Sequence, residues 1–267
     1  MAAKMKKCGS GMRLRSMLHV DLRRMFTTSL LYIMVASAVV IPILVTVMTT
    51  MMDGTVSVNP QTGVETVMEA FDSAWQIIGT TSGAGGAMDM SITGMCNINL
   101  VYFLVSVFVC LFVAEDFRSG YAKNLFTVRA DKTDYVISKT MTGFIAGSFM
   151  LLGFFVGAML GGMFSGLPFD MGDATVGSIV MCMLAKIALM AVFVPIYLVL
   201  SVFAKQKSWL SILISMMCGI FLFMMIPMLT PLDATIMNVI VCLAGGALFS
   251  VSLGIAGRAI LNRRDIL

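Results

Sequence analysis

The feature that most constrains this chain is a series of six long apolar stretches separated by short polar segments. Each is long enough to cross about 30 Å of hydrocarbon as a helix, which satisfies its own backbone hydrogen bonds where lipid cannot. The stretches are approximately Phe26–Met52, Asn97–Ala114, Thr140–Phe164, Val176–Ala204, Trp209–Leu229 and Ala234–Gly257. Only 12% of the residues are charged, against roughly 25% in ordinary globular chains. The sequence therefore predicts one all-α integral membrane domain over residues 1–267, with six transmembrane helices.

The distribution of lysine and arginine predicts the orientation of these helices. All but one of these residues lie before the first stretch, in the loops after the second and fourth stretches, or after the sixth. The loops 53–96, 165–175 and 230–233 contain none, and carry acidic residues instead. Because positive charge is retained on the cytoplasmic side, we expect a multi-pass protein of the cell membrane with both termini in the cytoplasm. The first apolar stretch is expected to remain as a span, since no cleavage site follows it.

Lys186 is the exception, since it lies inside the fourth apolar stretch. A charge at that depth is costly, and such residues commonly serve a transport pathway or an interface. Alternatively, the side chain extends to the outer headgroups while its stem stays in the apolar region. Both interpretations remain open on the sequence.

Two amphipathic segments are predicted beside the spans. Residues 1–25 are basic, and within them Met12–Met25 has apolar residues at helical spacing, as in helices that lie in the inner interface and bind anionic lipid. A basic flank that only sets the topology is the alternative interpretation of this segment. In the outer loop 53–96, a helix is expected over Gly63–Ile78, because its apolar residues share one helical face. Trp75 is expected at the membrane surface. The loop is interpreted either as a lid on the outer ends of the spans or as a gate that contacts substrate.

Small residues recur at every fourth position in two stretches, a spacing that allows membrane helices to approach closely. These residues are Gly153, Gly157 and Gly161 in the third stretch, and Gly246, Ser250 and Gly254 in the sixth. They predict helix packing, within the chain or between chains. Prolines at positions 42, 195 and 227 are expected to kink their helices.

The sequence lacks the residues that common catalytic chemistry needs. His19 is the only histidine, no carboxylate lies deep inside an apolar stretch, and no HExxH or GxxxxGK[ST] motif occurs. The six cysteines are scattered without a CxxC pair. We therefore expect no catalytic residues, no metal site and no cofactor in this chain. The missing buried carboxylates also weigh against a proton-coupled carrier.

The cytoplasmic loop 115–139 combines charged and apolar residues in a way that suits docking to a soluble protein, although a solvated loop that only sets topology is equally compatible with it. The residues are Glu115, Arg118, Gly120, Lys123, Leu125, Phe126, Arg129 and Lys139. The order of six of them (Glu115, Gly120, Lys123, Leu125, Arg129 and Lys139) resembles the loop after the second span in permease subunits of type-two ATP-binding-cassette (ABC) exporters. Two departures are the longer first outer loop and the short final outer loop, unless residues 226–231 mark a break.

The resemblance implies a coupling helix near Arg118–Val128, which would transmit nucleotide-driven movement, and a hinge anchored by Glu115 through Arg129 or Lys139. It also implies two copies of a cytoplasmic ATP-binding subunit, which would hold ATP and Mg, and a second permease, identical or homologous. The expected cargo is amphipathic or hydrophobic: a peptide, a lipid-like compound or a drug. Membrane lipid is a further expected partner, and nucleic acid is not. The alternatives are a membrane scaffold or assembly protein that transports nothing, and an ATP-independent channel or carrier.

Overall fold

The computed structural model describes residues 10–58, 65–67, 69–80, 96–128, 132–172, 174–204, 207–223 and 225–263. Within them, five helical segments are long and apolar enough to cross a membrane. The corresponding helices are α2 (Ser29–Met51), α4 (Val101–Arg118), α6 (Lys132–Ser165), α7 (Val176–Ala204) and α10 (Ile236–Arg263). The predicted all-α class is confirmed, and the chain is a multi-pass membrane protein.

The sequence predicts one span for the fifth apolar stretch, but in the structure this stretch is not one continuous helix. It is divided into α8 (Ser208–Phe223) and the short α9 (Ile226–Leu229). At 1.5 Å per residue, the 16 residues of α8 extend about 24 Å, less than the usual hydrocarbon thickness. Pro227 lies in the first turn of α9, where its missing N–H is not needed. By contrast, Pro42 and Pro195 lie inside continuous helices.

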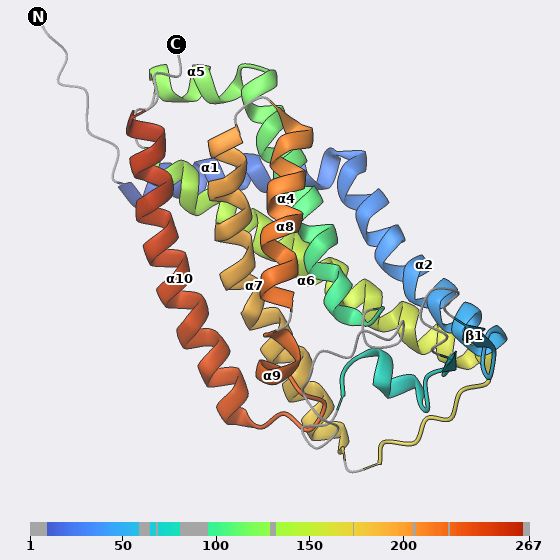
Figure 1. Cartoon of the computed structure of the whole chain (residues 1–267). Coiled ribbons are helices and arrows are strands. Elements are labelled where there is room, and N and C mark those ends of the chain that lie inside the picture. The colour runs from blue at the N-terminus through green and yellow to red at the C-terminus, as the bar shows by residue number, and fades with distance from the viewer. Residues whose placement is uncertain are drawn as a thin grey trace, which may run out of the picture.

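The core lies between α4, α6 and α7, with α2 and α10 on opposite flanks (Figure 1). α2 packs along α6, and α10 packs along α7. The Tyr102 and Phe193 rings join α4 to α7 with centroids 4.4 Å apart. One face of α2 and most of α10 remain exposed and apolar, including Leu44 and Leu248. Such faces suit contact with lipid or with another membrane subunit.

Two helices lie across one end of the bundle. They are α1 (Ser10–Thr27) and α5 (Tyr121–Val128), and they run across the direction of the long helices (Figure 1). The helix predicted over Met12–Met25 therefore corresponds to α1. Within the described residues, every lysine and arginine except Lys186 lies in α1 or α5, at the end of α4 or α10, in the first turns of α6, or directly before α8. These parts of the helices lie at the end where α1 and α5 cross (Figure 1). The charge asymmetry seen along the sequence is thus also an asymmetry in space.

The opposite end carries the first outer loop, and here a prediction is wrong. Instead of a helix over Gly63–Ile78, the described residues form strand β2 (Glu65–Val67), paired antiparallel with β1 (Val56–Val58), and a single 3-10 turn, η1 (Ala74–Ile77). Residues 63, 64 and 68 lie outside the described residues. Val67 pairs with Val56, whereas Phe71 and Ile78, expected on the same helical face as Val67, are buried in the core. The apolar residues contact different elements, so their helical spacing does not produce a helix.

Candidate functional site

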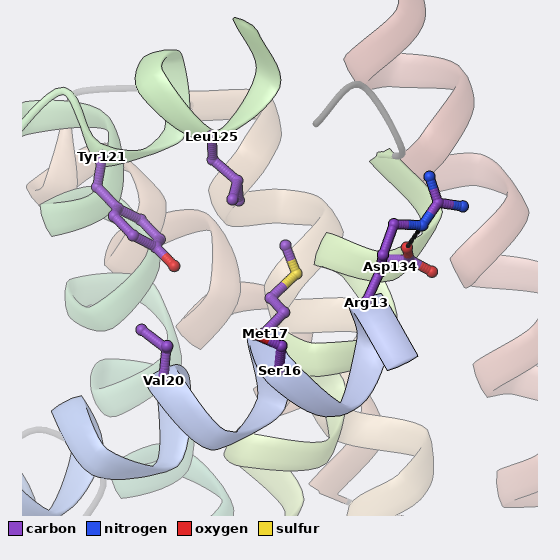
Figure 2. Close-up of a pocket in the computed structure, with 7 residues that line it drawn as sticks. All are labelled: Arg13, Ser16, Met17, Val20, Tyr121, Leu125 and Asp134. Atoms are coloured by element: carbon purple, nitrogen blue, oxygen red, sulfur yellow. Dashed lines mark ion pairs between the residues drawn. The ribbon is translucent and has the colours of Figure 1, made fainter. Parts of the chain in front are cut away.

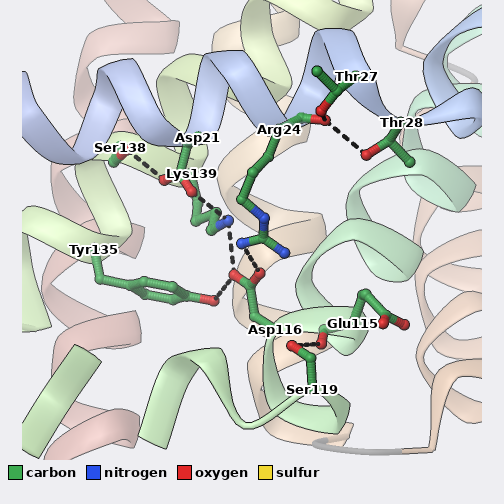
Figure 3. Close-up of polar contacts among 10 residues, drawn as sticks. All are labelled: Asp21, Arg24, Thr27, Thr28, Glu115, Asp116, Ser119, Tyr135, Ser138 and Lys139. Carbon is green, nitrogen blue, oxygen red and sulfur yellow. Dashed lines mark hydrogen bonds and ion pairs between the residues drawn. The ribbon is translucent and has the colours of Figure 1, made fainter. Parts of the chain in front are cut away.

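A cluster of buried charges joins α1, α4 and α6 at the end where α5 lies (Figure 3). We call it the ionic cluster, and its residues are Asp21, Arg24, Asp116, Tyr135, Ser138 and Lys139. It contains two acids and two bases, so its formal charges balance. Buried charges of this kind are tolerated only when they are paired and their hydrogen bonds are satisfied.

Asp116, near the end of α4, is the centre of the ionic cluster. Its side chain is fully buried, and its Oδ1 accepts a hydrogen bond from Arg24 Nη1 at 2.7 Å. Its Oδ2 lies 2.7 Å from Lys139 Nζ and accepts a hydrogen bond from the Tyr135 hydroxyl at 2.9 Å. One carboxylate thus fixes the end of α4 to both α1 and α6.

Asp21 closes the other side of the ionic cluster. Its Oδ1 accepts a hydrogen bond from Lys139 Nζ at 2.8 Å, and its Oδ2 accepts one from the Ser138 hydroxyl at 2.6 Å. The Lys139 ammonium also lies 4.1 Å from the centroid of the Phe112 ring. Lys139 is therefore enclosed by two carboxylates and an aromatic face, each of which stabilises its charge.

Arg24 connects the ionic cluster to α5. Its guanidinium lies 4.4 Å from the ring centroid of Tyr121, the first residue of that helix. Burial lowers the pKa of Arg24, but attraction to the Asp116 carboxylate more than compensates, so the pKa lies above its usual value. Burial and the nearby Asp21 and Asp116 carboxylates raise the pKa of Tyr121. The contact therefore joins a charged guanidinium to a neutral phenol, the combination that favours a cation–π interaction.

The hinge before α5 is built differently from the sequence prediction. Glu115 is exposed and pairs with Arg118 at 2.8 Å, one turn away on the same helix. Lys139, one of its two expected partners, is held by Asp116 and Asp21 instead. Arg129, the other, lies outside the described residues. The turn itself needs a glycine, because Gly120 has a φ of +74°.

Residues of α5 divide into an outward and an inward face. Lys123, Asn124 and Thr127 are exposed. Leu125 and Phe126, expected to be available for docking, are half-buried and packed against the core. Among the predicted coupling residues in the described chain, Arg118 and Lys123 are accessible cations, whereas the buried Lys139 cannot contact a partner directly.

A pocket lies between α1 and α5 (Figure 2). Met17 and Val20 of α1 line one side, and Tyr121 and Leu125 of α5 line the other. Its polar boundary includes Arg13 and Asp134, whose charged atoms are 3.9 Å apart. The two helices across this end are therefore separated by a partly apolar hollow. Among the described residues, no group of three or more potential ligands is arranged to hold a metal.

The small-residue pattern of α6 lies directly against α2. A Cβ at Gly157 would lie only 2.2 Å from the Val39 carbonyl oxygen, and a Cβ at Gly161 would lie 2.4 Å from the Thr46 hydroxyl. At Gly153 the nearest atom would be at an ordinary 3.4 Å. The close approach of α2 therefore depends chiefly on Gly157 and Gly161.

On α10, only two of the three small residues at every fourth position pack against a neighbouring helix of this chain. A Cβ at Gly246 would lie 2.8 Å from the Ala191 side chain of α7, and the Ser250 hydroxyl donates to the Ala191 carbonyl at 2.8 Å. A Cβ at Gly254, by contrast, would meet nothing within 4 Å. The first two positions face α7, while Gly254 imposes no close approach within this chain.

Lys186 is buried at 1% exposure, which contradicts the interpretation that it extends to the outer headgroups. Its ammonium donates hydrogen bonds to Asn99 Oδ1 and Thr230 Oγ1, both at 2.9 Å. Trp75, expected at the membrane surface, is half-buried and donates from Nε1 to the Phe169 carbonyl at 3.2 Å. Lys186 belongs to α7 and Trp75 to η1, neither of which contributes a residue to the ionic cluster.

Most of the ionic cluster was absent from the sequence prediction, although local spacing could have indicated it. Asp21 and Arg24 are three residues apart, and Tyr135 and Lys139 are four apart, so each pair shares a helical face. Asp116 directly follows the predicted anchor Glu115. No local signal shows that these faces meet, since they come from three separate helices.

Comparison with known protein families identifies the family to which this chain belongs. A model described as "ABC-2 family transporter protein" matches residues 27–222, which is most of the chain and includes α4, α5 and α6. No curated protein and no solved structure matches the chain. Together with the helical membrane architecture, the match shows that this chain belongs to the ABC-2 transporter family and is an ABC transporter permease.

Proposed function

We propose that this chain is the permease subunit of an ATP-driven exporter, and that a separate cytoplasmic ATPase docks on α5. The observation that carries the proposal is the attachment of α5. This short helix presents Lys123, Asn124 and Thr127 outward, while its first residue is fixed through Arg24 to the ionic cluster. A force applied to α5 would therefore reach α1, α4 and α6 together.

The energy source would be supplied in trans. The sequence contains no phosphate-binding loop, so ATP and Mg would be held by the partner, with two ATPase copies serving two permease subunits. The exposed apolar surface of α2 and α10 supports an assembly with a second permease, identical or homologous, with the remaining area facing lipid. The cargo would be amphipathic or hydrophobic: a peptide, a lipid-like compound or a drug.

The topology in this proposal has six spans with both termini in the cytoplasm. The short α8, extended by α9, would act as the fifth span. The gathering of basic side chains at the α1 and α5 end supports a cytoplasmic position for that end. α1 would lie in the inner interface of the cell membrane, against anionic lipid headgroups.

The decisive experiment is copurification from the native membrane, followed by quantitative binding. The expected result is an ATPase subunit that accompanies the chain in equal amount. Lys123→Glu should weaken that binding at least about tenfold, since it reverses a charge on the docking face. The matched control is Arg258→Glu, which reverses an exposed charge of α10 at the same end. Copurification without any nucleotide-hydrolysing subunit would instead support a scaffold, channel or carrier.

A further inference from the structure

Lys186 joins three separate elements at the end opposite α5. Its stem comes from α7, and its ammonium binds Asn99 of η2 (Ile98–Leu100) and Thr230, which follows α9. The backbone is fixed as well, because the Tyr102 hydroxyl of α4 donates to the Lys186 carbonyl at 2.9 Å. A single residue therefore connects α7, the start of α4 and the turn that precedes α10.

Both acceptors are oriented to receive the ammonium. The Thr230 hydroxyl donates its own proton to the Ile226 carbonyl at 2.8 Å, which leaves an oxygen lone pair for Lys186. Asn99 lies in η2, where its backbone N–H is capped by the Asn97 side chain at 3.0 Å. Other hydrogen bonds thus already hold Thr230 and Asn99 in place, so that both can accept from the Lys186 ammonium without a local rearrangement.

Two described residues of the first outer loop contact the turn that contains Thr230. The Leu232 N–H, two residues after Thr230, donates to the Thr80 carbonyl at 2.9 Å. A Cβ at Gly79 would lie 3.6 Å from the Leu232 nitrogen and 3.9 Å from Cys182 Sγ. Ile77 and Ile78 are fully buried beside it. Residues 79 and 80 of the outer loop, the Thr230 turn and α7 thus form one layer of contacts beside Thr230.

The energetics of this arrangement favour a two-state element. Burial removes the ammonium from water, at a cost that two neutral acceptors offset only in part. Opening the layer would break two hydrogen bonds but would return the charge to water, so the two states can differ by a small free energy. A buried apolar residue of similar length would favour the closed state alone, because opening would expose it to water without any gain in hydration of a charge.

Resting on the proposed transport function, we propose that Lys186 is the latch of an outer gate. In the closed state its ammonium holds η2 and the Thr230 turn against α7. In the open state the two hydrogen bonds break and water reaches the ammonium, which gives cargo an exit between these elements.

Two native cysteines report on this gate. Cys182 is fully buried, and its Sγ contacts the Thr230 carbonyl at 3.5 Å, while Cys242 is 2% exposed and contacts the Leu229 carbonyl at 3.9 Å. A membrane-impermeant, charged thiol reagent is applied to the outer side of sealed membrane vesicles that contain the full chain. Labelling of each cysteine is then followed by mass spectrometry of its peptide. Cys110, fully buried and in contact with Ser215 in another part of the bundle, reports global unfolding.

The variants remove one acceptor at a time without a large change of shape. Thr230→Val and Asn99→Leu each remove one of the two hydrogen-bond acceptors of the Lys186 ammonium. The loss should shift the equilibrium toward the open state about tenfold or more. Cys182 and Cys242 should therefore be labelled about tenfold faster, with Cys110 still protected. Adding Lys186→Met to either variant removes the buried charge and should restore slow labelling.

Three results would overturn the latch. The first is unchanged labelling of Cys182 in both single variants. The second is fast labelling that persists after Lys186→Met is added, and the third is labelling of Cys110 together with Cys182, which would mean that the bonds hold the whole fold. Because labelling needs no ATPase, failure of the latch is distinguishable from failure of the proposed docking on α5, which is measured by binding.

Discussion

Arg24 of α1 and Asp116 of α4 are 92 positions apart in the chain, yet their side chains form a hydrogen-bonded ion pair at 2.7 Å. The Arg24 guanidinium also lies over the ring of Tyr121, at the start of α5. This pair connects a helix across the end of the bundle to the loop that the family resemblance identifies with coupling. In the structure, the hinge before α5 is therefore anchored by Asp116, whereas the family resemblance implies its neighbour Glu115.

Asp116→Asn is expected to destabilise the protein strongly. It removes the carboxylate that pairs with Arg24 and one of the two that pair with Lys139, and removing one partner of a buried ion pair typically costs about 3–5 kcal/mol. Thermal unfolding in detergent should show a large fall in Tm. The control is Glu115→Gln, which removes an exposed pair with Arg118 and should cost less than about 1 kcal/mol. Equal losses in the two variants would contradict this assignment.

The charges of Asp21 and Lys139 are expected to be energetically coupled. Asp21→Asn and Lys139→Met each unbalance the ionic cluster, whereas the double variant restores neutrality. The double variant should therefore be more stable than the sum of the single losses predicts, by about 1–3 kcal/mol. Chemical unfolding of the four proteins measures this difference, and strict additivity would show that the two charges act independently.

Tyr121 is expected to transmit movement from α5 to α1. Tyr121→Leu removes the aromatic face beneath Arg24, an interaction worth about 1 kcal/mol, while Tyr121→Phe keeps it. With the ATPase bound, the leucine variant should lose several-fold in transport-coupled ATP hydrolysis, and the phenylalanine variant should resemble the wild type. The affinity for the ATPase should be similar in all three. If the leucine variant couples normally, the contact is only structural.

Gly157→Ala is expected to separate α2 from α6. The new Cβ would meet the Val39 carbonyl at 2.2 Å, a backbone atom that cannot rotate away, and overpacking of this kind costs roughly 1–3 kcal/mol. Gly254→Ala is the matched control, because its Cβ would meet nothing within 4 Å. Thermal unfolding should separate the two variants clearly. A Gly254→Ala effect that appears only in an assembled complex would place that position at a contact between subunits.

Several elements could be predicted from the sequence because their signals are local. Apolar stretches long enough for a span, and the spacing that marks α1, depend only on neighbouring residues. The outer loop failed as a helix, since the residues on its expected apolar face are divided between the β1–β2 pair and the buried core. The break between α8 and α9 was likewise hidden by continuous hydrophobicity.

The sequence by itself determined that this chain is a helical membrane protein, because hydrophobicity adds residue by residue along each stretch. It also determined where the basic residues lie relative to the spans. Only the tertiary structure decided that Asp116 rather than Glu115 holds Lys139, and that Lys186 is enclosed instead of reaching the headgroups. The reason is that the environment of a charge depends on which helices pack around it, and those helices are distant in the chain.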